Sequence, residues 1–176
     1  MTDSTFKTSK LAECDAASNA KNETNDCTVR ALAAASGASY DEAHAALAKH
    51  GRPYRKGPTA SWGFGKGGRR FIDCPALRKA AADLGCTWRV LEPTEYTAKT
   101  MTTAERDRRL ASGRYICMVR GHVAALVEGE VIDWTAGRRH QIKEVYEVVP
   151  GAKAKAEPQD RGPMKSMTLF DQGSLF

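Results

Sequence analysis

The pattern of apolar and polar positions is typical of helices up to Gly113 and typical of strands after it. In the first part, short apolar segments follow N-capping residues and end near glycines, as short helices do. Ser39 and Glu42 match the S-x-x-E pattern of a capping box, and Thr102 and Glu105 repeat it. The pattern predicts helices over residues 27–36, 39–50, 73–85 and 102–113.

After Gly113 the chain consists of runs rich in β-branched and aromatic residues, separated by turns that contain glycine. Such runs are typical of strands, and their close spacing predicts an antiparallel meander. An earlier segment, 86–93, alternates in the same way and predicts one further strand. The runs of the predicted meander are 114–121, 122–129, 130–135 and 140–150.

The order of these elements, helices first and strands later, predicts an α+β domain in which N-terminal helices pack on an antiparallel sheet. We place this domain at residues 22–150. Residues 1–21 are polar and lack a hydrophobic period, so we expect a flexible N-terminus there. Residues 151–165 have the Pro, Gly, Ala and charged composition of a linker, and a short apolar segment, 166–176, follows them.

Composition narrows the class of protein. The chain has 176 residues, of which 41% are hydrophobic, enough for one folded domain of ordinary size. Its five cysteines are an odd number and include no CxxC pair, which favours reduced thiols over a disulfide framework or a zinc site. The sequence opens without an apolar leader, and no run has the length of a membrane-spanning helix. We therefore expect a cytoplasmic protein with no metal, no other cofactor and no membrane contact.

The net charge of +6 adds a possible class of partner. Basic residues gather in three short segments, 51–57, 65–70 and 136–140. Basic loops of this kind can make weak contacts with nucleic acid or with an acidic partner. A solvated basic surface explains the same pattern equally well.

Candidate chemistry centres on Cys27, which stands where a polar turn meets the first predicted helix. A helix N-terminus lowers the pKa of a thiol, and a nearby imidazolium does the same. His122 opens one predicted strand, and Asp133 lies on the next strand, across a turn at Glu128–Gly129. If this hairpin is symmetric about its turn, His122 lies one diagonal step from Asp133. A thiol nucleophile needs a base and a third group that orients the base, and these three residues supply that set.

Two stretches carry a resemblance to a known family. "NDCTVRALAAASG" and "GRYICMVRGHVAALVEGEVIDW" are similar to papain-like cysteine peptidases, in particular to the compact peptidase-C39-like and NlpC/P60-like branch, a pattern also common in small bacteriophage proteins. The resemblance covers about 22–37 and 113–149. It implies a papain-like fold, with Cys27 as nucleophile, His122 as general base and acid, and Asp133 as the residue that orients the imidazole.

One position departs from the family. Papain-like enzymes often have a Gln several residues before the nucleophile, where its amide completes the oxyanion hole. Asn22 is the candidate here, since its amide donates the same hydrogen bond on a shorter arm, and the backbone N–H of Cys27 is the second donor. The departure leaves open an amidase, a transferase or a relative without activity. For Cys27 itself, the alternative is a small packed residue that happens to begin a helix.

A glycine-rich segment, 52–73, separates the second and third predicted helices. It lacks the G-x-x-x-x-G-K-[ST] pattern of a phosphate-binding loop. Long loops inside a domain are often functional, so we take Trp62 and Phe64 as candidates for substrate contact in a flap over the site. A disordered glycine loop is the alternative.

The chain ends with "QGSLF", which resembles the short peptide by which bacterial replication and repair proteins bind the sliding clamp. The resemblance assigns clamp binding to Gln172, Leu175 and Phe176. An extended tail suits this role, because two large apolar side chains can enter a preformed pocket while the Gln amide orients them. The alternative is a tail that packs on its own domain.

Two hypotheses of different class follow. The first is a papain-like thiol hydrolase or acyltransferase, of the peptidase or amidase type, that acts on a protein or peptide substrate and is recruited to the sliding clamp by its tail. The second is a catalytically inert, phage-type binding protein that engages the clamp and modulates replication or repair. In either case the expected location is the cytoplasm, that of the bacterial host if a phage encodes the chain.

Overall fold

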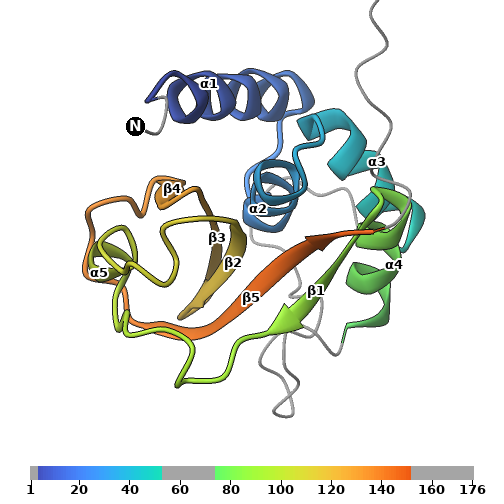
Figure 1. The fold of residues 1–176 in the computed structure, drawn as a ribbon. Helices are drawn as coiled ribbons and strands as arrows, with labels where there is room; N and C mark the ends of the chain where they lie inside the picture. The colour runs from blue at the N-terminus through green and yellow to red at the C-terminus, as the bar shows by residue number, and fades with distance from the viewer. Residues whose placement is uncertain (1–3, 53–73, 152–176) are drawn as a thin grey trace, which may run out of the picture.

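The computed structural model describes residues 4–52 and 74–151, and this part of the chain forms five helices and one five-stranded sheet (Figure 1). The α+β class predicted from the sequence is therefore confirmed. In chain order the elements are α1 (Ser4–Lys21), α2 (Cys27–Ser36), α3 (Tyr40–Lys49), α4 (Pro75–Asp83), β1 (Cys86–Val90), α5 (Met101–Ala104), β2 (Arg114–Val119), β3 (His122–Val127), β4 (Glu130–Ile132) and β5 (Ile142–Pro150).

The sheet has the strand order β1-β5-β2-β3-β4, and every neighbouring pair is antiparallel. The strands β2, β3 and β4 follow one another as the predicted meander does. The meander prediction is wrong for the last strand, because β5 returns across the sheet to lie between β1 and β2. Hydrophobic alternation identifies a strand but does not name its partner, which depends on the loop that precedes it.

The central helix α2 lies between α1 and the sheet (Figure 1). Five consecutive residues from Ala31 to Ala35 are at most 2% exposed. A helix that is apolar on all sides is one that is buried, and the small alanine side chains let α2 pack closely against β3 and α3. The helix ends at Gly37, whose φ of 82° is left-handed and whose N–H donates to the carbonyl of Ala33.

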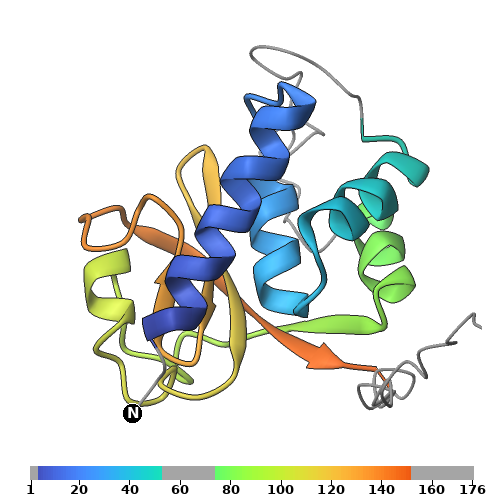
Figure 2. The ribbon, with the colours of Figure 1, turned by 90° about the horizontal axis from the view of Figure 1, so that it is seen from above.

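Most of the N-terminal segment that we expected to be flexible, 1–21, is helical in the structure. From Ser4 onward it forms α1, which crosses over α2 when seen from above (Figure 2). Cys14 is 2% exposed on its inner face, and the ammonium of Lys10 donates to the carbonyl of Ala38 at 2.6 Å. These contacts are mostly polar or made by small residues, so they leave no hydrophobic period in the sequence.

Helix α3 begins as predicted, at a capping box. The Ser39 hydroxyl accepts the N–H of Glu42, and the Glu42 carboxylate accepts the N–H of Ser39. Helix α5 is different, because its capping box joins Thr100 to Thr103 and the helix ends at Ala104. The longer helix predicted over 102–113 is therefore wrong.

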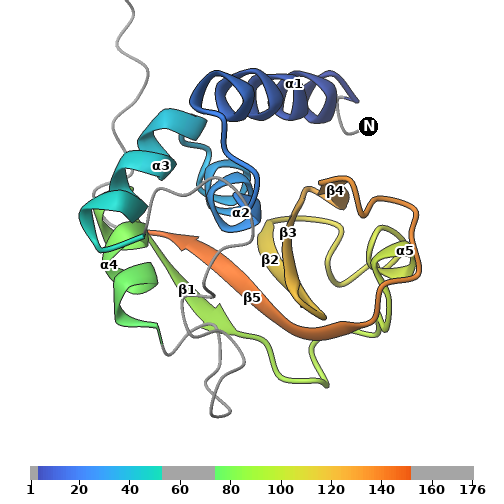
Figure 3. The same ribbon diagram turned by 180° about the vertical axis from the view of Figure 1, so that it is seen from behind.

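Both faces of the sheet are buried. Alternate residues of β2 point into different cores: Ile116 packs with α2, α3 and α4, and Cys117 packs with the chain that leads from β1 through α5. Figure 3 shows this chain running along the side of the sheet away from α2. A sheet covered on both faces has strands that are apolar at nearly every position, as β3 is.

Candidate active site

The hairpin of β3 and β4 positions two of the candidate residues. Ala125 pairs with Ile132 and Val127 pairs with Glu130, which is the register expected for a turn at Glu128–Gly129. Both turn residues have positive φ, 49° and 79°, as a type I′ turn requires. Going outward from this turn, the first residue of β3 and the residue that follows β4 come to the same end of the hairpin.

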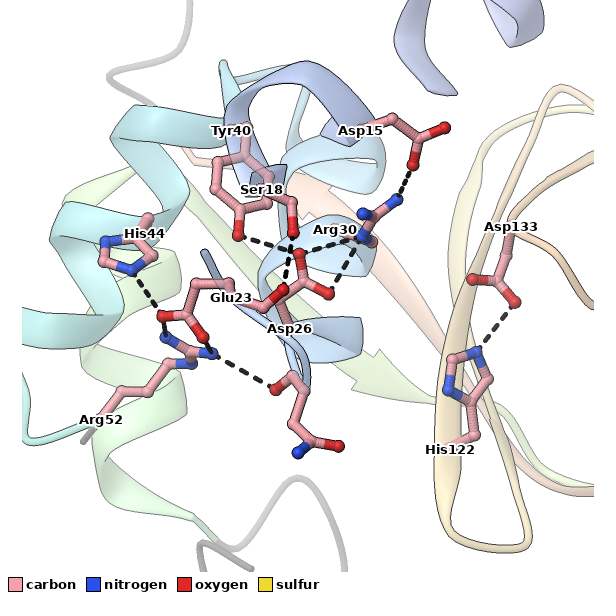
Figure 4. A network of polar contacts seen from close by, with 11 residues as sticks. Asp15, Ser18, Glu23, Asp26, Arg30, Tyr40, His44, Arg52, His122 and Asp133 are labelled. Carbon is pink, nitrogen blue, oxygen red and sulfur yellow. Dashed lines mark hydrogen bonds and ion pairs between the residues drawn. The ribbon is translucent and has the colours of Figure 1, made fainter. Parts of the chain in front are cut away.

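Those two residues are His122 and Asp133, and they are hydrogen-bonded. Nε2 of His122 lies 2.8 Å from Oδ2 of Asp133, in a place where the imidazole is 15% and the carboxylate 4% exposed (Figure 4). A carboxylate only accepts hydrogen bonds, so Nε2 carries the proton. The same oxygen accepts the backbone N–H of Thr135 at 3.0 Å. Asp133 is thereby fixed from its own chain, and Nδ1 of His122 remains for another partner.

Cys27, the first residue of α2, interacts with the same imidazole. Burial by itself raises the pKa of the Cys27 thiol. The hydrogen bond with His122 and the charge of its imidazole act in the opposite direction, as do the backbone N–H of Val123 and the hydroxyl of Thr28. The result is a pKa below that of an ordinary thiol.

His122 changes in the matching direction. Burial lowers the pKa of its imidazole, but the hydrogen bonds to Asp133 and Cys27 and the charges of both raise it, to about 9. The lowered pKa of the thiol and the raised pKa of the imidazole both shift the proton from Cys27 towards His122, the direction of a thiolate–imidazolium pair. Such a pair holds a nucleophile and a proton donor side by side.

The other buried thiols behave in the opposite way. Burial raises the pKa of Cys14 and of Cys86 to about 11, and that of Cys117 to about 12. All five cysteines lie in the described part of the chain and are unpaired. Cys27 therefore differs from these three thiols by its electrostatic surroundings.

The short segment before Cys27 is fixed by a buried ion pair. Arg52 donates to both oxygens of Glu23, at 2.8 and 3.1 Å, and also to the carbonyl of Asn25 at 3.3 Å (Figure 4). His44 contacts the Glu23 carboxylate as well, at 3.0 Å. The Glu23 side chain is 1% exposed and that of Arg52 6%. This cluster joins the end of α3 to the turn that leads into Cys27.

Asp26, which immediately precedes Cys27, anchors the turn on its other side. Arg30 donates to both of its carboxylate oxygens, at 3.0 and 2.9 Å, and the hydroxyl of Tyr40 donates at 2.9 Å. Asp26 is the N-cap residue of α2, but its carboxylate makes no capping hydrogen bond. The first-turn N–H groups of α2, that of Cys27 among them, are therefore left uncapped by this side chain.

Sequence reasoning missed one residue beside the site. Trp134 directly follows Asp133 and is 53% exposed. Its ring centre lies 5.1 Å from that of His122 and 5.4 Å from that of His140, and the guanidinium carbon of Arg138 lies 4.9 Å from it. The signal for Trp134 was its place in the chain, an aromatic residue one position beyond a candidate site residue.

Asn22, the candidate oxyanion donor, ends α1 with a left-handed φ of 56° and is exposed. Among the described residues, no hydrogen bond joins its amide to Cys27, His122 or Asp133, so its role stays a prediction. The other predicted contact residues lie outside the described residues, as does the linker from residue 152 onward. They are Trp62, Phe64, Gln172, Leu175 and Phe176.

Within 4–52 and 74–151, His, Cys, Asp and Glu side chains form no group of three or more that could hold a metal ion. In the same ranges, no helix combines the length and the apolar character needed to cross a bilayer. A scan against protein-family models, a search of curated proteins and a search of solved structures each found no match to this chain.

Proposed function

We propose that the protein is a papain-like thiol hydrolase or acyltransferase, of the peptidase or amidase type, with Cys27 as its nucleophile. The observation that carries the proposal is the pairing of a thiol of lowered pKa with His122, whose other nitrogen is fixed by Asp133 at 2.8 Å. The resemblance of the segments around these residues to papain-like enzymes supports the same roles. The substrate we propose is a protein or peptide.

In the acylation step, the Cys27 thiolate attacks the carbonyl carbon of an amide and a C–S bond forms. In this proposal the backbone N–H of Cys27, at the N-terminus of α2, donates to the oxyanion. Protonated His122 then delivers its Nδ1 proton to the amide nitrogen as the C–N bond breaks. The products of this step are an amine and a thioester of Cys27.

In the second step, neutral His122 accepts a proton from the incoming nucleophile. Water gives a carboxylic acid, and an amine gives a new amide. The C–S bond breaks, and the thiolate–imidazolium pair forms again. Asp133 keeps Nε2 protonated throughout, so the proton exchanged with the substrate is the one on Nδ1.

The test is selective alkylation. At pH 7 and limiting iodoacetamide, mass spectrometry of the intact, folded chain should find Cys27 modified at least tenfold faster than each other thiol. His122→Ala should remove this advantage, because burial of Cys27 remains while the opposing imidazolium is gone. Equal labelling of all thiols in the wild-type chain would overturn the proposal. The internal comparison uses Cys14, Cys74, Cys86 and Cys117.

A second function rests on the C-terminal sequence "QGSLF". We propose that Gln172, Leu175 and Phe176 bind the bacterial sliding clamp. In this proposal a phage encodes the chain, which acts in the cytoplasm of the bacterial host. If the thiol site is catalytically inert, the function of the protein is to bind the clamp and to modulate replication or repair. Purified clamp should bind the full chain but not a chain that ends at residue 171, and equal binding of the two would overturn this second proposal.

A further inference from the structure

Among the described residues, the indole of Trp134 is the largest exposed apolar side chain beside the candidate active site, at 53% exposure. Its neighbour Asp133 is buried, so the two consecutive side chains differ in exposure. The indole contacts the imidazole of His122. The guanidinium carbon of Arg138 lies over the indole, 4.9 Å from its centre. Figure 4 shows the Asp133 carboxylate beside the His122 ring, on the residue that precedes Trp134.

The backbone around this indole is fixed. Helix α5 has first-turn N–H groups that its own turns cannot satisfy. Met101 donates to the carbonyl of His140 at 3.0 Å, and Thr102 donates to the carbonyl of Arg138 at 3.2 Å. The N–H of Arg138 in turn donates to the carbonyl of Thr135 at 3.0 Å. Arg138 therefore projects from an anchored turn.

Arg138 supplies a positive charge beside the indole. Arg138 is exposed, and within the described residues no carboxylate pairs with its guanidinium. A guanidinium over an indole keeps its N–H donors free for a carboxylate, which two parallel N–H groups fit well. The His122 imidazolium on the other side of the indole is paired with Asp133, so Arg138 is the charge that this place offers to a ligand.

We propose that Trp134 and Arg138 form a substrate subsite that binds a carboxylate-bearing side chain of a peptide, next to the bond attacked by Cys27. The indole packs against the stem of that side chain, and Arg138 pairs with its carboxylate. This inference rests on the proposed function, since it names the substrate class of the same site.

An arginine beside an exposed indole can also bind a nucleic acid, through its phosphates and by stacking of its bases. The position of the pair favours the peptide. Trp134 contacts His122 itself, so a group bound there belongs to the molecule that reacts. A thiolate that forms a thioester needs an acyl carbon, which a peptide offers and a phosphodiester backbone does not.

The first experiment uses two reagents that differ in charge, iodoacetate and iodoacetamide. The ratio of their rates at Cys27, measured at pH 7 in low salt, reports anion binding beside the thiol. Arg138→Ala should lower this ratio roughly threefold to tenfold, as expected for one nearby charge, and Arg138→Lys should restore most of it. Arg139→Ala is the matched control, because Arg139 is the exposed neighbour with no contact to the indole in the structure. In 1 M salt, where charges are screened within about 3 Å, wild type and Arg138→Ala should converge.

The outcomes separate the two proposals. If iodoacetamide modifies Cys27 no faster than the other thiols, the proposed function fails. If Cys27 is selectively modified but Arg138→Ala and Arg139→Ala give the same ratio as wild type, the subsite is wrong and the proposed function stands. Thermal melting of each variant checks that Arg138→Ala is folded, and the Arg138→Lys result distinguishes loss of charge from loss of packing.

The second experiment measures binding with Cys27→Ala, which cannot turn over a substrate. A fluorescent decapeptide with alternating Glu and Gly should bind, and its Gln counterpart should bind at least fivefold more weakly. Trp134→Ala and Arg138→Ala should each remove this preference. Equal binding of the two peptides would overturn the subsite. Tighter binding of a single-stranded oligonucleotide of ten residues, lost in Arg138→Ala, would overturn the peptide assignment in favour of nucleic acid.

Discussion

His122 and Asp133 are joined by a hydrogen bond of 2.8 Å from Nε2 to Oδ2, eleven residues apart in the chain and across a two-residue turn. The bond fixes both the orientation and the tautomer of the imidazole, because the acceptor is a carboxylate that also receives the N–H of Thr135. It also stabilises the imidazolium. The state of the Cys27 thiol therefore depends on a carboxylate that interacts with it through His122.

Asp133→Asn tests this dependence through pH. In the wild type, the pKa of Cys27 is lowered and that of His122 is raised to about 9, so loss of the imidazolium proton sets the upper pH limit of a thiolate–imidazolium pair. Removing the negative charge lowers the pKa of His122, by about 1–3 units for a neighbouring charge. The upper limit of the pair should move to lower pH accordingly. NMR titration of the His122 ring protons, assigned with the His122→Ala chain, measures this limit, and an unchanged upper limit would contradict the assigned role of Asp133.

Arg52→Ala should destabilise the fold by about 3–5 kcal/mol, since it leaves the Glu23 carboxylate buried without its main partner. Urea unfolding gives the difference in free energy. Lys79→Ala, at an exposed position of α4, is the control and should change stability by less than about 0.5 kcal/mol. Adding Glu23→Gln to Arg52→Ala should recover part of the loss, because the unpaired charge is then removed. A loss below about 1 kcal/mol in Arg52→Ala would show that the ion pair does not fix this turn.

We expect the Glu23 carboxylate to make the stability of the fold depend on pH in the acidic range. Burial raises the pKa of Glu23, but its hydrogen bonds to Arg52 and His44 lower it more, so the folded pKa is below the ordinary value of 4.5. A carboxylate with a lowered pKa stabilises the fold above its unfolded pKa, and this contribution disappears as the pH falls through the folded pKa. The urea concentration at the unfolding midpoint should therefore decrease as the pH drops below about 4.5. In Glu23→Gln this decrease should be less steep. Parallel acid profiles for the two chains would contradict this assignment.

Ala33→Leu tests the packing of α2. Ala33 is fully buried in the helix that lies between α1 and the sheet, so a larger side chain has no space to occupy. Overpacking of this kind costs about 1–3 kcal/mol. Ala48→Leu, on the exposed face of α3, is the matched substitution and should change stability by less than about 0.5 kcal/mol. Urea unfolding of both chains measures the difference, and equal stability would show that α2 is loosely packed.

Local patterns predicted the local parts of the fold. The turn at Glu128–Gly129 fixed the register of β3 and β4, and with it the approach of His122 to Asp133, because a two-residue hairpin leaves one arrangement. The capping box of Ser39 and Glu42 lies within four residues and was found for the same reason. The proximity of Cys27 to His122 came instead from the family resemblance, since no periodicity relates residues so far apart.

Contacts between distant segments were the ones that the sequence did not reveal. Helix α1 is attached through polar and small residues such as Lys10 and Cys14, which carry no amphipathic period. The burial of Glu23 and Arg52 follows from their mutual pairing across 29 residues, and each alone resembles a surface charge. The position of β5 beside β2 has the same cause, because a strand pattern does not encode its neighbour.

The pairing of Cys27 with His122 has a further consequence, since one residue begins α2 and the other begins β3. The acidic thiol exists only while the helical layer and the sheet are in contact, and separation of the two layers returns Cys27 to an ordinary thiol. The alkylation rate of Cys27 therefore reports local opening between α2 and the sheet. Combined with hydrogen exchange of the Val123 amide, it can time that opening in the native protein without any added probe.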